Sequence, residues 1–177
     1  MVHKCEVGKC DVEGTIIDFV TGEEVADTFV ERIRQGTERF LVENKNYSKG
    51  DIEVGSESVK LKADLIVRVG DKRVIIIKCI YGSLVAGERL VLSYARLFDS
   101  YQIPFAVITN GEDAEVLDTI SGEVIGSGLE AIPSKDDLNI KEINFTELPE
   151  DRIVKEKRIL DAFESINEMT CSRGGRQ

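Results

Sequence analysis

Residues 59–80 contain two different strand patterns separated by a short polar turn. From Val59 to Val69, apolar residues alternate with mostly polar ones, which is the period of two of a strand with one covered face. After the turn Gly70–Lys72, the run Val74–Ile80 is apolar at every position except Lys78. Such a run is typical of a central strand covered on both faces. The chain is therefore predicted to contain a hairpin whose second strand lies inside a sheet.

The flanking segments predict helices and further strands around this hairpin. A strand is predicted at 15–20, and a helix at 28–44, where Thr28 and Glu31 form an S/T-x-x-E capping box. A second helix at about 86–101 separates the apolar strand from a strand at 105–108, so these two strands should be joined by a parallel crossover. Short strands are expected at 115–117 and 123–125, and a C-terminal helix at 151–169. The prediction is an α/β (α+β) fold with a mixed central sheet flanked by helices.

Length and composition limit the classes of protein to consider. The 177 residues fit one core, with an N-terminal extension at 1–13, a main domain at 14–130 and a C-terminal helical appendage at 131–177 packing on the same core. The net charge of −10 is unfavourable for nonspecific DNA binding, which depends on Lys and Arg.

We expect a cytoplasmic protein, because no apolar run could span a membrane and the N-terminus lacks the apolar core of a signal peptide. His3, Cys5, Cys10 and Cys171 are weak candidates for a zinc site, and reduced cysteines are favoured.

Asp64 and Lys78 are the two charged residues of the hairpin most in need of an explanation. A lysine in an apolar strand is costly unless it is paired or used. If the loop has three residues, Gly70–Lys72, Asp64 lies directly opposite Lys78 on the same face, whereas a two-residue loop places them on opposite faces. The pattern therefore predicts either a buried ion pair or a functional site.

The order of short motifs along the chain resembles a known nuclease family. Asp27-Thr28, Glu31–Gln35 and Asn46-Tyr47-Ser48 are followed by Ala63–Val67, Ile76-Ile77-Lys78, Ser93-Tyr94-Ala95 and Thr109-Asn110-Gly111. In this order they resemble the N-terminal nuclease domain of type I restriction enzyme R subunits, a branch of the PD-(D/E)xK nucleases. The resemblance implies a restriction-endonuclease-like fold and covers residues 14–126. The motor that follows this domain in the R subunit has no counterpart within the 177 residues, so we expect a stand-alone version of the module.

The resemblance also implies phosphodiester hydrolysis with Mg²⁺. In the family two carboxylates hold the metal, and a lysine orients the attacking water and stabilises developing charge. Asp64 would be the first metal ligand and Lys78 the lysine. The second carboxylate stands two residues before the lysine in the family, where this chain has Ile76. An isoleucine cannot bind a metal, so the site is degenerate or rearranged.

Three explanations of Ile76 remain open. A replacement carboxylate could come from Glu88, the first choice for a catalytic and metal-binding role, or from Glu31 or Glu38 on the first helix. The domain could instead have lost catalysis and act in binding or assembly, or Asp64 and Lys78 could form only an ion pair. Glu31 is also explained by the capping box, and Glu88 by its place in the first turn of a helix.

Two classes of function follow from these alternatives. One is a DNA-associated nuclease-fold protein with weak or no endonuclease activity, or a protein-interaction module of the same fold. The other is an active Mg²⁺-dependent DNA endonuclease that uses Glu88 or Glu31. A homodimer through the C-terminal helix is one option for assembly. No GxxxxGK[ST] loop is present, so no nucleoside triphosphate is expected, and neither is a membrane partner.

Overall fold

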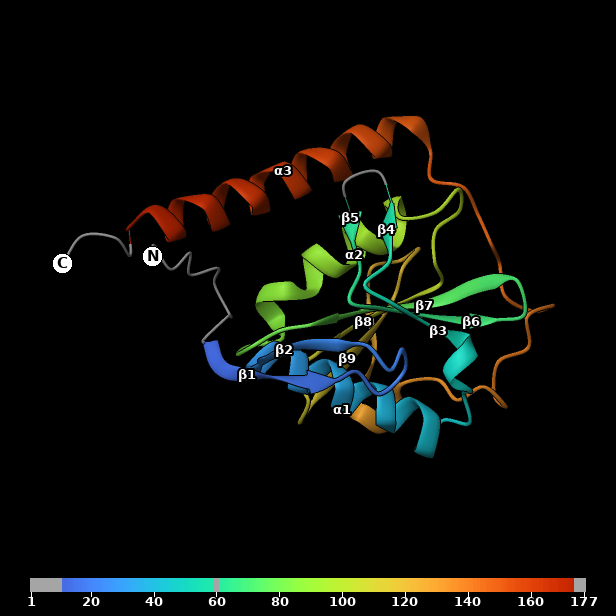
Figure 1. The fold of residues 1–177 in the computed structure, drawn as a ribbon. Helices are drawn as coiled ribbons and strands as arrows, with labels where there is room; N and C mark the ends of the chain where they lie inside the picture. Colours follow the sequence, from blue (N-terminus) through green and yellow to red (C-terminus); the bar gives the residue numbers. More distant parts are fainter. Residues whose placement is uncertain (1–10, 59–60, 174–177) are drawn as a thin grey trace.

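The computed structural model describes residues 11–58 and 61–173 (Figure 1). His3, Cys5 and Cys10 lie outside this part of the chain, as does the side chain of Cys171, so the candidate zinc ligands are not placed. Within the described residues, no helix combines the length and apolar character needed to cross a bilayer.

A six-stranded mixed sheet forms the centre of the fold, in the order β10-β9-β8-β7-β6-β3. Its strands are β3 (Ile52–Val54), β6 (Leu65–Val69), β7 (Lys72–Cys79), β8 (Phe105–Thr109), β9 (Ala114–Asp118) and β10 (Val124–Ser127). The β7–β8 pair is parallel and every other pair is antiparallel. The parallel crossover and the interior position of β7 are therefore confirmed.

Two helices cover opposite faces of this sheet. Helix α1 (Phe29–Asn44) and the segment after β10 bury one face through Ile75, Ile77 and Cys79 of β7. Helix α2 (Glu88–Leu97), preceded by the 3-10 turn Val85–Gly87, covers the other face, where Ile76 is buried. Because successive residues of a strand point to opposite faces, the apolar run of β7 supplies both cores.

Smaller elements surround the sheet. β1 (Asp11–Ile17) and β2 (Glu24–Thr28) form an antiparallel hairpin beside α1, and β4 (Glu57–Ser58) pairs with β5 (Leu61–Lys62). The predicted strand 59–69 is thus interrupted at Ala63–Asp64, and residues 59–60 are not described. The sequence pattern missed β2 and β3, because both are short and lack clear alternation.

Helix α3 (Glu150–Arg173) lies along the outer side of α2 (Figure 1). A fully buried carboxylate joins the two helices: Glu156 accepts hydrogen bonds from Arg89, Ser93 and Arg96, at 2.8–2.9 Å. Burial alone would raise the pKa of Glu156, but the hydrogen bonds from Arg89 and Ser93 and the positive charges of Arg89 and Arg96 together outweigh burial and lower that pKa. The predicted C-terminal helix is confirmed, and polar contacts buried beneath it help attach it to the domain.

Candidate active site

The hairpin β6–β7 brings Asp64 and Lys78 together by a route that the sequence did not predict. Val69 pairs with Lys72, so the turn contains only Gly70 and Asp71, and the expected three-residue loop is wrong. A β-bulge between Val67 and Arg68 in this pairing shifts the register by one residue. Beyond the bulge, Leu65 pairs with Ile77, which puts the next positions, 64 and 78, opposite each other. The bulge therefore restores the shared face that a regular two-residue hairpin would have lost.

Asp64 already has a partner for each of its carboxylate oxygens. Lys78 Nζ donates to Oδ1 at 3.1 Å, and the backbone N–H of Cys79 donates to Oδ2 at 2.8 Å. Asp64 thereby supplies an acceptor at the end of the β6–β7 ladder. Lys78 Nζ also lies 3.4 Å from the carbonyl oxygen of Lys62 and 5.2 Å from the ring centroid of Tyr94. Both charged side chains keep one fifth of their surface exposed, so the pair is accessible at the sheet end.

Ile76 is the residue at the position where the nuclease resemblance predicts a second carboxylate, and it is only 1% exposed. It lies on the α2 face, in the same core as Val91, Ala95 and Ala106. This core is apolar and closely packed, so an oxygen ligand at position 76 would have to be brought into a dry environment. The isoleucine is thus part of the core between the sheet and α2.

Glu31 and Glu38 lie on the other side of the sheet, where α1 packs. There Arg34 pairs with Glu31, Glu38 and Asp18, and its Nη2 lies 2.6 Å from Asp18 Oδ2. Glu31 also accepts a hydrogen bond from Gln35 at 3.0 Å. Thr28 caps the helix by accepting from the Glu31 N–H, which confirms the predicted N-cap, although the Glu31 carboxylate turns to Arg34. Burial raises the pKa of Glu38 to about 7.

Glu88 is on the same side of the sheet as Lys78, at the start of α2, and its neighbour is another acid. Burial and the proximity of Glu88 raise the pKa of Glu115 on β9. The row Lys78, Ile108, Glu115 crosses three neighbouring strands, so Lys78 and Glu115 have Cα atoms about 10 Å apart. Glu115 was not predicted as a site residue, although a glutamate among the apolar residues of a short strand is a signal that the sequence contains.

Gly87 allows α2 to approach the sheet at this point. A Cβ at position 87 would lie 2.0 Å from Cδ1 of Ile108, so only glycine fits without rearrangement. The close approach also brings Glu88 down to the sheet, next to Glu115. Ser93 and Arg96 of the same helix are buried and bind the Glu156 carboxylate.

The residues around Asp64 do not fit the two-carboxylate magnesium site. Mg²⁺ takes hard oxygen ligands in octahedral geometry. Here one carboxylate, Asp64, is bound to an ammonium group and a backbone N–H, and Ile76 offers no ligand. Within residues 11–58 and 61–173, no three His, Cys, Asp or Glu side chains are grouped so that they could hold a metal ion. Asp64 and Lys78 are brought together as predicted, whereas Glu31 and Glu88 have other contacts.

Comparison with protein families gives one match. Residues 30–133 match the family model described as type I restriction enzyme R protein N terminus. The match extends from α1 to the segment after β10, and so includes the hairpin, α2 and β8. Neither curated proteins nor solved structures gave a significant match.

Proposed function

Because the chain belongs to the family of type I restriction enzyme R protein N termini, we propose that it is a nuclease-fold protein that associates with DNA without cutting it by the two-carboxylate metal mechanism. The observation that carries this proposal is Ile76, which is buried at the place of the second metal ligand. The contacts of Asp64 support it, since Lys78 and the Cys79 N–H neutralise and orient the remaining carboxylate.

The ion pair has a structural role that does not depend on catalysis. Removing Asp64 would leave the buried N–H of Cys79 without its acceptor, and the ammonium of Lys78 with only the carbonyl oxygen of Lys62. An unmade buried hydrogen bond costs about 1–3 kcal/mol. The pair therefore stabilises the end of the β6–β7 ladder whether or not the protein binds metal.

The first experiment asks whether the protein cuts DNA. Supercoiled plasmid is incubated with purified protein and Mg²⁺ or Mn²⁺, and nicking is followed on gels. The matched variants are Asp64→Ala and Asp71→Ala, since Asp71 is an exposed aspartate in the turn of the same hairpin. The proposal expects no nicking in any of the three proteins. Nicking that is lost in Asp64→Ala and retained in Asp71→Ala would contradict it.

The second experiment asks whether the protein binds DNA. Fluorescence anisotropy with labelled single- and double-stranded oligonucleotides at low salt should show binding that weakens as salt increases, because phosphate contacts release counterions. If no DNA binds at low salt, the DNA part of the proposal fails, and an interaction module of the same fold is favoured.

A second candidate function is a rearranged, active Mg²⁺-dependent endonuclease. The Glu88–Glu115 pair favours it, because these carboxyls lie on the same sheet face as Lys78. This candidate expects Mn²⁺ binding by calorimetry that is lost in Glu115→Gln and in Glu88→Gln. If the wild-type protein does not bind Mn²⁺, or if the two variants bind it as the wild type does, this candidate is dismissed.

A further inference from the structure

Two exposed cations near the C-terminal half of α1 lie over the same aromatic ring. Arg39 belongs to α1, and Lys49 begins the 3-10 turn Lys49–Asp51. Both lie over the ring of Phe19, at 4.4 Å and 4.0 Å from its centroid. Lys49 also donates a hydrogen bond to the carbonyl oxygen of Phe19. The two positive charges are therefore held close together on the surface.

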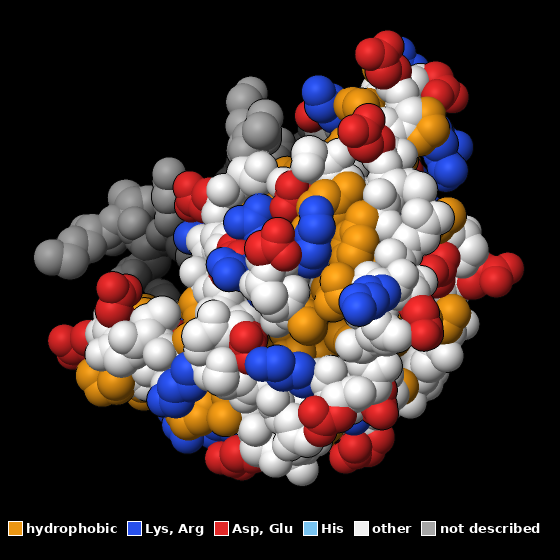
Figure 2. All heavy atoms as spheres, turned by 90° about the vertical axis from the view of Figure 1, so that its right-hand side faces the viewer, with side chains coloured by type: hydrophobic (Ala, Val, Ile, Leu, Met, Phe, Trp, Pro, Cys, Tyr) orange, Lys and Arg blue, Asp and Glu red, His pale blue; other side chains and the backbone are white. Residues whose placement is uncertain are grey.

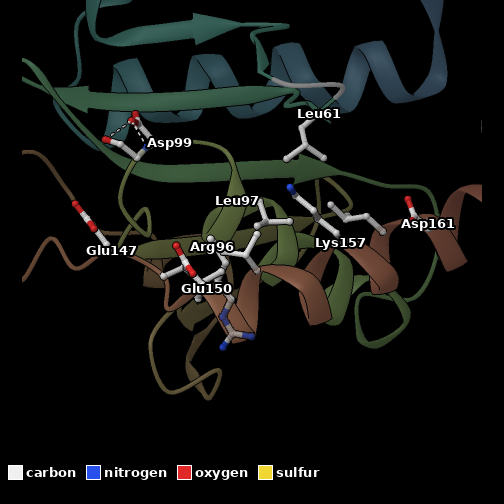
Figure 3. A pocket seen from close by; sticks show the side chains of 12 residues that line it. Leu61, Arg96, Leu97, Asp99, Glu147, Glu150, Lys157 and Asp161 are labelled. Atoms are coloured by element: carbon white, nitrogen blue, oxygen red, sulfur yellow. Dashed lines mark hydrogen bonds between the residues drawn. The ribbon is translucent and has the colours of Figure 1, made fainter.

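Most other lysines and arginines before α3 have an acidic partner within the described part of the chain. The face shown in Figure 2 mixes Lys and Arg with Asp and Glu side chains over most of its area. Arg96 and Lys157 likewise line a cavity beside α3 together with acidic side chains (Figure 3). Arg39 differs, because its neighbour Glu43, one helical turn further along α1, forms no ion pair with it among the described residues. Arg39 and Lys49 are therefore available to an anion from outside the protein.

Gly36 lies on the same exposed side of α1. Positions 32, 36 and 39 follow the i, i+4, i+7 spacing of one helix face, and all three residues are exposed. Glycine inside a helix is less stable than alanine, and a Cβ at position 36 would meet no atom within 4 Å, so packing in the described structure does not require a glycine there. A helix position without a side chain lets a ligand approach the backbone closely. Gly36 thus leaves an open path beside Arg39.

The charges of this surface favour an anion. Arg39 and Lys49 repel each other, since both charges lie within 4.4 Å of one ring centroid. The negative face of the Phe19 ring attracts both cations, and a phosphate oxygen bound by them would relieve their repulsion. Arg32, on the other side of Gly36, is paired with Asp27 at 2.6 Å. The excess positive charge is therefore concentrated at Arg39 and Lys49.

We propose that the phosphate backbone of DNA binds to Phe19, Gly36, Arg39 and Lys49, which together we call the α1 surface. The inference rests on the DNA association proposed above and specifies where DNA is held. Arg39 and Lys49 donate to phosphate oxygens, and Gly36 gives the strand access to the helix. Because α1 covers one face of the sheet and Lys78 lies on the other face, against α2, the bound DNA is held away from the hairpin site. Phosphate contacts carry no sequence information, so binding is independent of sequence.

The test measures how the affinity for a labelled duplex oligonucleotide depends on salt, by fluorescence anisotropy. Each phosphate contact contributes about 0.9 to the slope of log K against log salt concentration. Arg39→Gln/Lys49→Gln should therefore reduce the slope by about 1.8 and weaken binding at 0.1 M salt by about 10- to 60-fold. The control Lys155→Gln/Arg158→Gln removes one lysine and one arginine from exposed positions of α3 and should change both quantities far less. A duplex of the same length and unrelated sequence should give the same values.

Gly36→Leu separates DNA binding from folding. Leucine favours a helix more than glycine does, and position 36 is open, so this variant should unfold at a higher temperature than the wild type. It should nevertheless bind the duplex several-fold more weakly, because the new side chain blocks the approach to the helix. The control Ala162→Leu adds bulk at an exposed position of α3 and should bind DNA as the wild type does.

The outcomes distinguish this inference from the proposed function. If the wild type binds DNA and Arg39→Gln/Lys49→Gln binds it equally well, the α1 surface is not the binding site, whereas DNA association stands. If the wild type binds no oligonucleotide at low salt, both proposals fail. Equal weakening in the α3 control would show an effect of net charge alone and overturn the inference. So would displacement of the duplex by inorganic phosphate at the same phosphate concentration, which indicates a site for a small anion.

Amide chemical-shift mapping with the same duplex locates the contact independently of the variants. The shifts should fall on the α1 surface. Shifts around Asp64 and Lys78 instead would place the DNA at the hairpin and overturn the inference.

Discussion

Introducing a glutamate at position 76 would test directly whether the missing carboxylate is excluded by the core. In Ile76→Glu, the side chain would replace an isoleucine that is 1% exposed and packed under α2. The loss of isoleucine burial costs about 1.5–3 kcal/mol. A glutamate with an ordinary pKa of about 4.3 that stays neutral at pH 7 costs a further ~3.7 kcal/mol, from ~2.7 pKa units at ~1.36 kcal/mol each. The variant should therefore lose about 5–7 kcal/mol, a large part of a typical stability of 5–15 kcal/mol.

The pH dependence separates the two contributions. Burial raises the pKa of the new carboxyl in the folded state. The stability that is lost by keeping this carboxyl protonated is therefore absent below its unfolded-state pKa and grows as the pH rises above that value. At about pH 5 this protonation cost falls to ~1 kcal/mol. Between pH 7 and pH 5 the free energy of unfolding of the variant should therefore rise by about 2.7 kcal/mol relative to that of the wild type. Urea unfolding followed by circular dichroism measures this difference, and Ile76→Gln is the control that loses the isoleucine without adding a titrating group. A loss below about 1.5 kcal/mol with no pH dependence would refute the reasoning, since the carboxylate would then reach water.

Divalent metal provides the functional part of this experiment. If position 76 is where the family's second ligand belongs, Mg²⁺ or Mn²⁺ should restore part of the stability of Ile76→Glu, because a ligand that binds only the folded state stabilises it. The same ions should not stabilise Ile76→Gln, nor Ile76→Glu in which Asp64 is replaced by Asn. Equal stabilisation of all three proteins would show that position 76 is not next to a metal site.

Three further predictions concern buried groups. Burial raises the pKa of Glu38 to about 7, so this carboxyl destabilises the folded state increasingly as the pH rises from about 4.5 to 7. Over that interval the stability of Glu38→Gln should rise relative to wild type by about 1–3 kcal/mol. Urea unfolding at several pH values measures this difference. Glu156→Ala should cost about 3–5 kcal/mol in the same assay, because Arg96 would be left buried without its partner. Gly87→Ala should lower stability by about 1–3 kcal/mol, since its new methyl would overlap a β8 side chain. The control Gly36→Ala, in open space on a helix, should raise stability by about 0.5–1 kcal/mol in thermal unfolding.

The elements that the sequence predicted well are those whose signal is local and periodic. The apolar run of β7, the crossover through α2 and the N-cap at Thr28 each follow from residues close together in the chain. Strands β2 and β3 gave no such signal, because neither contains an apolar run or a clear alternation, and each depends on the strand with which it pairs. The bulge in the β6–β7 hairpin was also unpredictable, since the pairing register depends on packing against both helices.

The features of the candidate site likewise fall into those that the sequence predicts and those that depend on the tertiary structure. The sequence alone determined that Asp64 and Lys78 lie on the two sides of one hairpin turn and that Ile76 offers no ligand, because these facts depend on residue type and on the position of the turn. Only the tertiary structure decided that the Asp64 carboxylate binds the Cys79 N–H and that Glu31 turns to Arg34 while Glu88 lies next to Glu115. The local sequence pattern determines to which helix or strand a residue belongs. Which groups a side chain meets depends on elements far apart in the sequence, whose packing brings the charges close enough to pair.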